Sequence, residues 1–360
     1  MKKLLALVLV LAMSLFAFVG CTQKQPAAPV AEEPAAEEPA TEEPAEEPSA
    51  DNAVKTGLAI VTSVGKSKDA SADADGVGQS DSVAIAVTVD KDGKVVKAVI
   101  DNAQTKINFS AEGKVTSDMT VAYKSKQELK EEYGMVKASK IGKEWYEQAN
   151  TLAEYFVGKT ADEIKAIPTD DAGVPTDADL VSSVTIKIND YKETVAKAIE
   201  NAQDLGATAE DTLGLGIVTT IAKSKDAAAD AEGQTQAYST YTATTFGKDG
   251  KITSNIIDSS QATVKFDATG KISTDLTAPV KTKVELGDAY GMKKASQIGK
   301  EWFEQAAAFS AFVTGKTADE VAGIAMDAEG NATDADLVSS VTVGIEGFLE
   351  IIAKAAASAK

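Results

Sequence analysis

The segment YGMVKASKIGKEWYEQA at residues 133–149 decides how the chain is organised, because it returns as YGMKKASQIGKEWFEQA at residues 290–306. The two copies are identical at 14 of 17 positions, lie 157 residues apart and align without a gap. A second segment, TDADLVSSVT at 176–185, returns unchanged at 333–342. A period this long indicates tandem domains rather than a solenoid, whose units span about 20–50 residues.

The repeat therefore predicts two homologous domains, at residues 56–203 and 213–360. Each spans about 145 residues, which is long enough for a domain to bury a proper core.

Strand patterns occupy the first part of each unit. Val83, Ile85, Val87 and Val89 alternate with small residues, and a turn at 90–93 follows. A second apolar run at 95–100 and another turn at 111–114 predict an antiparallel meander.

Helical patterns follow after Lys124. One apolar face is predicted in each unit, formed by Trp145, Ala149, Leu152 and Phe156 and by Trp302, Ala306, Phe309 and Val313. The spacing of Thr160 and Glu163, and of Thr317 and Glu320, is typical of capping boxes at the start of short helices. A last helix is predicted at about 190–202, with Asp190 and Glu193 in the same spacing. Strands first and helices after predict an α+β fold in each domain.

The composition excludes several classes of function. Lys and Arg together number 36 against 55 Asp and Glu, so the net charge is −19, and the chain has no Arg, no His and one Cys. Without His there is no Ser-His-Asp triad or imidazole base, and one Cys cannot supply a thiolate zinc site. An acidic chain without Arg is a poor partner for nucleic acid. Chemistry beyond carboxylates, Lys and hydroxyls must come with a cofactor.

The N-terminus has the pattern of an export signal. Lys2 and Lys3 precede an uncharged apolar run from Leu4 to Val19, which is short for a membrane span and typical of a signal peptide at residues 1–20. The end of the run, Phe-Val-Gly-Cys21, resembles the bacterial lipoprotein box. The resemblance implies cleavage before Cys21 and a lipid on its sulfur, which would anchor the chain to the membrane. Plain secretion with an incidental Cys is the alternative.

Residues 21–55 join the lipidated Cys to the first domain. Six of the nine prolines lie here, with pairs of Glu between them and no apolar periodicity. Such a segment cannot bury a core, so a disordered, extended tether is predicted.

A short motif occurs unchanged in both units: Asp179-Leu-Val-Ser182-Ser183-Val-Thr185 and Asp336-Leu-Val-Ser339-Ser340-Val-Thr342. It resembles the flavinylation sequence of FMN-binding domains, which runs Asp, two variable residues, Ser or Thr, a residue that is commonly Gly, a small residue that is usually Ala, and the acceptor Thr. In this chain Ser183 and Ser340 stand where Gly is common, and Val184 and Val341 stand where Ala is usual. The resemblance implies FMN bound covalently at Thr185 and Thr342, with Asp179 and Asp336 read by a flavin transferase.

Flanking residues extend this resemblance over nearly all of 57–202 and 214–356. Lys124–Leu129, Tyr133-Gly-Met and Gly142-Lys-Glu-Trp145 are similar to tandem FMN-binding lipoproteins of Gram-positive bacteria. The resemblance implies a redox carrier rather than a classical enzyme, on the extracellular face of the membrane. Electrons would come from a membrane quinone-linked redox complex and pass to ferric iron or soluble flavin.

Other interpretations remain open. The repeated motif could be an Asp-initiated turn of a flavin-free lipoprotein that binds a solute or a partner. Trp145 and Trp302 could pack in the core or line the flavin ring. The end of the signal peptide, Ser14–Gly20, resembles lipoprotein signal ends that are released as peptide pheromones. The acidic segment 69–76 does not fit an EF-hand loop, so no metal site is predicted.

Overall fold

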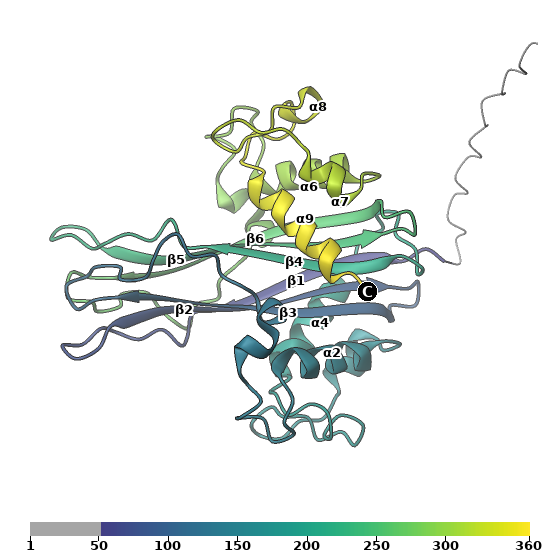
Figure 1. The fold of residues 1–360 in the computed structure, drawn as a ribbon, viewed down its shortest axis with the longest axis horizontal. Helices are drawn as coiled ribbons and strands as arrows, with labels where there is room; N and C mark the ends of the chain where they lie inside the picture. Colours follow the sequence, from purple (N-terminus) through teal and green to yellow (C-terminus); the bar gives the residue numbers. More distant parts are fainter. Residues whose placement is uncertain (1–51) are drawn as a thin grey trace, which may run out of the picture. The chain divides into compact units, whose positions relative to one another are not determined.

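The computed structural model describes residues 52–360 of the chain, which form a mixed α/β unit with two three-stranded antiparallel sheets (Figure 1). This architecture is compatible with the predicted α+β class. The predicted signal peptide, Cys21 and nearly all of the predicted tether lie outside the described residues.

Each sheet is a simple meander of three strands. In the first half of the chain, β1 (Lys55–Ser63) pairs with β2 (Gly76–Val89), which pairs with β3 (Val95–Phe109). In the second half the strands are β4 (Thr212–Thr220), β5 (Gly233–Phe246) and β6 (Ile252–Phe266). The predicted turn after Val89 is confirmed, and the Asp90 carboxylate closes it by accepting the N–H groups of Asp92 and Lys94, each at 2.9 Å.

The helices follow the strands in both halves. The first half contains α1 (Lys126–Leu129), η1 (Lys130–Tyr133), α2 (Trp145–Phe156), α3 (Ala161–Lys165) and α4 (Asn189–Glu200). The second half contains α5 (Lys283–Leu286), η2 (Gly287–Tyr290), α6 (Trp302–Val313), α7 (Ala318–Ala322), α8 (Ala335–Val338) and α9 (Glu346–Ser358). Apart from α8, every element of the second half begins 157 residues after one of the first.

Two of the predicted capping boxes are confirmed and one prediction is wrong. Thr160 and Thr317 each accept the N–H of the Glu three residues later, and that Glu bonds back to the threonine N–H. By contrast, α4 begins at Asn189 after Ile188, which makes no side-chain cap bond. Asp190 therefore lies inside the first turn, where its charge favours the positive end of the helix dipole.

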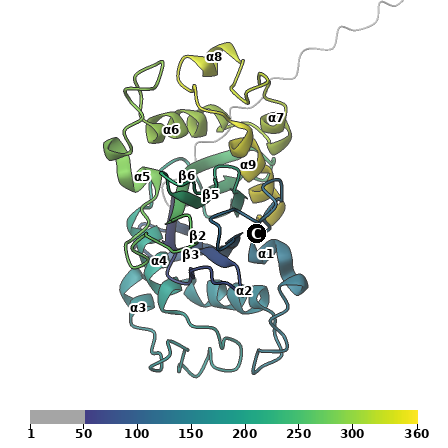
Figure 2. The ribbon, with the colours of Figure 1, turned by 90° about the vertical axis from the view of Figure 1, so that its left-hand side faces the viewer.

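The helices cover the outer faces of the two sheets. Figure 2 shows α2 and α3 on one side of the paired sheets and α6 and α7 on the other. In the first half, Trp145, Leu152 and Phe156 of α2 pack with Ile85 and Val87 of β2 in one buried cluster. The predicted apolar helix face is therefore confirmed as the face that meets the sheet.

The inner faces of the two sheets pack against each other. Leu58, Ile60, Ala84 and Ala86 of the first sheet share a buried cluster with residues of the second, namely Leu213, Leu215, Ile217, Tyr241 and Ala243. The absence of a side chain at Gly78 lets the Thr235 side chain of the other sheet pack against its backbone, because a Cβ added to Gly78 would lie 1.8 Å from Thr235 Oγ1. Since the two halves share this core, the domain boundaries at 56–203 and 213–360 stay a prediction.

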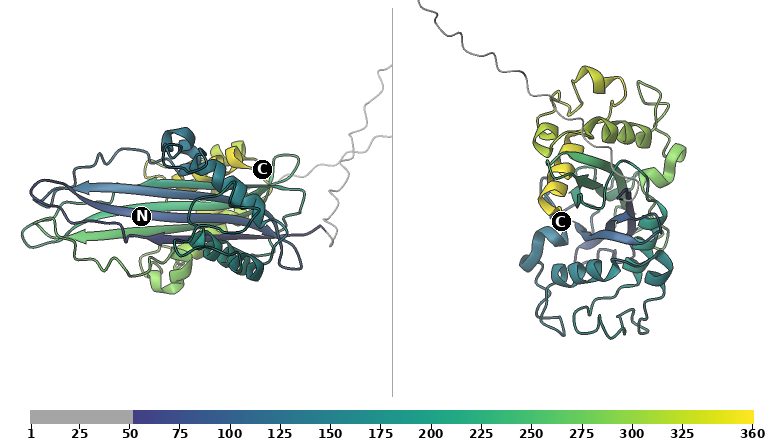
Figure 3. Two further views of the ribbon diagram at one scale, coloured as in Figure 1. Left: turned by 90° about the horizontal axis from the view of Figure 1, so that it is seen from below. Right: turned by 90° about the vertical axis from the view of Figure 1, so that its right-hand side faces the viewer.

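The strands of both sheets extend beyond the helices (Figure 3). At that end Phe109 stacks on Phe266 with ring centroids 4.1 Å apart. Two reciprocal bonds join the halves there: the Asp226 carboxylate accepts the N–H of Val115 at 2.9 Å, and Asp69 accepts that of Ile272 at 2.7 Å. Asp69 belongs to the acidic segment 69–76, which does not fit an EF-hand loop. Its carboxylate therefore has a structural role in joining the two halves.

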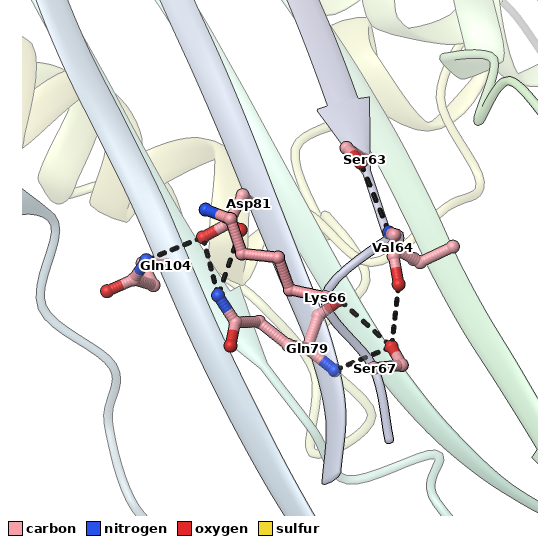
Figure 4. A network of polar contacts seen from close by, with 8 residues as sticks. Ser63, Val64, Lys66, Ser67, Gln79, Asp81 and Gln104 are labelled. Carbon is pink, nitrogen blue, oxygen red and sulfur yellow. Dashed lines mark hydrogen bonds and ion pairs between the residues drawn. The ribbon is translucent and has the colours of Figure 1, made fainter. Parts of the chain in front are cut away.

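Polar side chains replace apolar ones where β2 and β3 extend past the helices. The Asp81 carboxylate lies 2.9 Å from Lys66 Nζ and accepts bonds from the amides of Gln79 and Gln104 (Figure 4). This change from apolar to polar residues is expected where a sheet face meets solvent.

Candidate functional site

The two copies of the repeated motif form turns just before the last helix of each half. We call residues 179–185 and 336–342 the threonine turns. Asp179 and Ser182 are exposed, while Ser183 and Thr185 are half-buried. The second turn has the same pattern of exposure, with its first residues in the short helix α8.

Two apolar side chains hold each turn against the core. Leu180 and Val184 are fully buried in the cluster that also contains Trp145. Both Ser183 and Val184 donate their N–H to the Leu180 carbonyl at 2.8 Å, which closes the turn. Leu337 and Val341 are buried in the same way in the second half. The Val that replaces the usual Ala of the motif is thus a core residue, and it leaves the hydroxyl-bearing residues at the surface.

A buried glutamine holds the first threonine. Gln148, a buried residue of α2, accepts three bonds at Oε1: from Thr185 N at 2.8 Å, Thr185 Oγ1 at 3.2 Å and Ile186 N at 3.2 Å. The carboxamide therefore fixes the backbone around Thr185 and positions its hydroxyl.

The second half repeats this geometry. Gln305 of α6 accepts bonds from Thr342 N at 2.8 Å, Thr342 Oγ1 at 3.2 Å and Val343 N at 3.2 Å. Both glutamines are fully buried.

The other end of each glutamine reaches a second loop. Gln148 Nε2 donates to Ser139 Oγ and to the Lys143 carbonyl, both at 3.2 Å. The loop is also held at its start, because the buried Glu144 carboxylate accepts the N–H groups of Met135 and Val136 at 2.8 and 3.1 Å. A loop and a threonine turn that are far apart in sequence thus meet at one carboxamide.

The remaining predicted site residues lie on the turns but make few contacts across them. Asp179 and Asp336 donate their N–H to the carboxylates of Asp177 and Asp334, and their own carboxylates accept no hydrogen bond from residues 52–360. Ser182 lies 3.5 Å from Ser183, oxygen to oxygen, and the two serines of the second turn donate to nearby carbonyls: Ser339 to Asp336 and Ser340 to Leu337. The structure therefore brings the threonines together with the glutamines, and leaves Asp179 and Asp336 accessible.

The tryptophans are core residues. Trp145 and Trp302 are both buried. The Trp145 indole donates to the Tyr191 hydroxyl at 3.1 Å, and Trp302 packs edge-on against Phe348. Lys126 and Lys283 lie over the faces of these indoles. Of the two interpretations of the tryptophans, core packing is the one that the structure bears out.

The sequence analysis missed Gln148 and Gln305. Both lie in the segment EQA of the most similar part of the repeat, and both fall on an apolar helix face where a glutamine is unusual. The sequence signal that could have identified them is a polar residue at the same position of the apolar helix face in both copies of the repeat.

Metal-binding and membrane-spanning features are absent from residues 52–360. No group of three or more Cys, Asp or Glu in this range is arranged to hold a metal ion. Within the same range, no helix has the length and apolarity needed to cross a bilayer. The proposed lipid site, Cys21, lies outside it.

Comparison with known proteins gives no relatives: no protein-family model, curated protein or solved structure matches this chain.

Proposed function

We propose that the chain is an exported, lipid-anchored electron carrier built from two homologous FMN-binding domains, with one FMN attached covalently at Thr185 and one at Thr342. The observation that carries the proposal is the double occurrence of one arrangement. In each half a threonine lies in an accessible turn with its hydroxyl 3.2 Å from a buried glutamine carboxamide. When bound, FMN would supply the redox chemistry, and the chain would supply attachment, orientation and electrostatic surroundings.

The residues of the turn fit a phosphodiester on the threonine. Thr185 is partly exposed and Ser182 of the same turn is exposed, which leaves the threonine hydroxyl within reach of an incoming phosphate. Esterification of Oγ1 removes one of three bonds to Gln148 Oε1, while the two from backbone N–H groups remain. The turn therefore keeps its main support when the hydroxyl is modified.

The proposed partners follow from the same assignment. A flavin transferase would recognise Asp179 and Asp336, both of which are exposed. A membrane quinone-linked redox complex would donate electrons, and ferric iron or soluble flavin would accept them. Lipid on Cys21 would keep the carrier at the extracellular face of the membrane, behind a signal peptide at residues 1–20.

Covalent flavin is tested by fluorescence on a denaturing gel. Protein exported from cells that contain a flavin transferase should give a fluorescent band, because a phosphodiester survives denaturation and a bound flavin does not. Asp179→Ala should halve the signal by blocking the first site only. A dark band for the unmodified chain would contradict the proposal.

A cavity between the two halves favours a second candidate, a flavin-free lipoprotein that binds a solute. Its volume is about 450 Å³, within the range of small-molecule sites. Val99, Leu215 and Ile217 form an apolar wall, and the Lys354–Glu128 ion pair, with its atoms 2.9 Å apart, lies at the cavity. A dark band on the gel would leave this function as the better account.

A further inference from the structure

A second cleft lies beside α6, where the segment that joins the two halves passes the second half. We call it the α6 cleft. Its volume is about 500 Å³, within the range of small-molecule sites. Phe303, Ala307 and Ala311 line it from one face of α6, because residues four apart on a helix lie one above the other. The rest of its lining comes from β6, α5, the joining segment and the end of α6: Asn255, Ile256, Ile257, Val284, Gln203, Leu205, Ser310 and Thr314.

Apolar residues line this cleft at positions where the first half has polar ones. Four lining residues differ in this way from the residues 157 positions earlier: Val284 for Gln127, Phe303 for Tyr146, Ala307 for Asn150 and Ala311 for Glu154. Because these four replacements all have the same direction and all line one cleft, they indicate a change in what the surface contacts.

The replaced residues form a polar network in the first half. Gln127 Nε2 and Lys360 Nζ both donate to Asn150 Oδ1, at 3.1 and 3.0 Å. The side chains of Val284 and Ala307 have no polar atoms with which to form such a network. Apolar surface is left facing solvent instead, since Val284 is 47% exposed and Leu205 of the joining segment is 37% exposed.

Two further replacements place a buried polar pair in the lining. Asn255 and Ser310 stand where the first half has Ala98 and Ala153. Both are buried, and Ser310 Oγ donates to Asn255 Oδ1 at 2.7 Å. The Asn255 amide donates in turn to two threonine hydroxyls of β5, both at 2.8 Å. Within residues 52–360 no group donates to Ser310 Oγ, so this oxygen can still accept a hydrogen bond from a ligand.

The lining of the α6 cleft carries no charge among the described residues, although 25% of the chain's residues are charged. The charged residues next to the lining in sequence are engaged elsewhere or exposed: Glu285 pairs with Lys197, Lys283 Nζ donates to the Tyr238 hydroxyl, Glu304 accepts the N–H of Glu301, and Asp204 is exposed. An ion in the cleft would lose water without gaining an opposite charge, which is unfavourable. The cleft therefore favours an uncharged ligand.

We propose that the α6 cleft binds small uncharged aromatic molecules that carry one O–H or N–H group, such as phenols and aryl amines. The ring packs on Phe303 and Val284 and removes their exposed apolar surface from water. Its O–H or N–H donates to Ser310 Oγ, whose own hydrogen is held by Asn255. This site is independent of the proposed flavin function, because neither contact involves a threonine turn.

The first experiment locates the site with 1-naphthol, which is uncharged at neutral pH and has one hydroxyl. It is titrated into the full chain produced without a flavin transferase, and the backbone amide signals are followed by NMR. The largest saturable shifts should fall at 203–205, 255–257 and 303–314. Largest shifts at other residues, or no saturable shift, would overturn the proposal.

Related probes test the chemical class of the ligand. 1-Naphthoate keeps the rings and adds a negative charge, so it should bind about tenfold more weakly or less than that. Ser310→Ala should lower the affinity for 1-naphthol by about two- to tenfold, the effect of one hydrogen bond. The same variant should bind 1-methoxynaphthalene, which has no donor, as the unmodified chain does. Equal binding of naphthoate and naphthol, or equal weakening of naphthol and methoxynaphthalene by Ser310→Ala, would overturn the assignment.

A final variant gives the α6 cleft the side chains of the first half. Val284→Gln, Phe303→Tyr and Ala307→Asn together should weaken 1-naphthol binding about tenfold, because they make the walls polar. Binding as tight as in the unmodified chain would overturn the proposal.

The matched control makes the reverse changes in the first half. Gln127→Val, Tyr146→Phe and Asn150→Ala together should leave the shifts at 303–314 unchanged. Both triple variants carry residues that the other copy of the repeat accommodates at these positions. Equal weakening in the two variants would place the effect outside the α6 cleft and overturn the assignment.

Discussion

Gln148 accepts the backbone N–H of Thr185 at 2.8 Å from a fully buried position on α2. This bond ties the threonine turn to the helix layer, so the position of the proposed acceptor hydroxyl depends on a residue 37 positions earlier. The same relationship joins Gln305 to Thr342.

Replacing Gln148 by Ala should damage the first turn and spare the second. The change leaves the N–H groups of Thr185 and Ile186 without their acceptor, at a cost of about 1–3 kcal/mol for each that stays buried. Urea unfolding should show the lower stability, and mass spectrometry should show loss of flavin at Thr185 only. Gln305→Ala is the mirror control, and equal losses at both sites in either variant would contradict the account.

A methyl group at Gly57 should destabilise the fold. A Cβ there would lie 2.0 Å from the Ala198 carbonyl oxygen, because α4 packs directly on β1. Overpacking of this kind costs about 1–3 kcal/mol, so Gly57→Ala should lower the urea midpoint. Gly65→Ala, where the nearest atom is 3.3 Å away on the Ser63 side chain, is the control. Similar effects of the two changes would show that the helix is not packed this closely.

The buried carboxyl of Asp101 should make stability depend on pH. Burial raises its pKa from 3.8 to about 7, although Ser125 and the N–H groups of Gln127 and Asn102 bond to it. Between pH 4 and pH 7 the folded chain keeps a proton that the unfolded chain has released. The contribution of Asp101 to the free energy of unfolding therefore falls as pH rises through this window.

Asp101→Asn should remove this contribution, because the amide stays neutral at every pH. Its stability relative to the unmodified chain should rise from pH 4 to pH 8 in urea titrations. Asp171→Asn, at an exposed position, is the charge-matched control. An Asp101→Asn variant whose relative stability is the same at both pH values would show that the carboxyl titrates normally.

Cys21→Ala should release the protein into the medium. The proposed lipid on Cys21 would be the anchor; within residues 52–360 no helix is long and apolar enough to span a bilayer. Immunoblots of cell and medium fractions measure the distribution. Retention of the variant on the membrane would point to another anchor.

Part of the fold could be predicted from the sequence because its apolar pattern is strong. The alternation from Val83 to Val89 and the helix face at Trp145 both identified core residues. The small residues between the valines, Ala84 and Ala86, were not recognised as a second buried face. They are buried because the other sheet packs on them, and a single unit of the repeat carries no signal of that contact.

The extent of β2 was underestimated for a related reason. Residues 76–82, GVGQSDS, show no apolar alternation, yet they continue the strand. Their pairing with β3 and the close approach of Gly78 to Thr235 hold them in place. At the site, the motif identified the threonines, but the support from Gln148 depends on a tertiary contact that the local sequence does not encode.

The central claim is that Thr185 and Thr342 each carry one covalent FMN, and intact mass of the full chain coexpressed with a flavin transferase tests it most directly. The unmodified chain should gain the mass of two FMN groups, Thr185→Ala and Thr342→Ala one each, and the double variant none. Folding should survive, because a Thr→Ala change at a surface turn costs no more than about 1–2 kcal/mol. A single variant that loses both flavins, or a double variant that keeps either, would contradict the assignment.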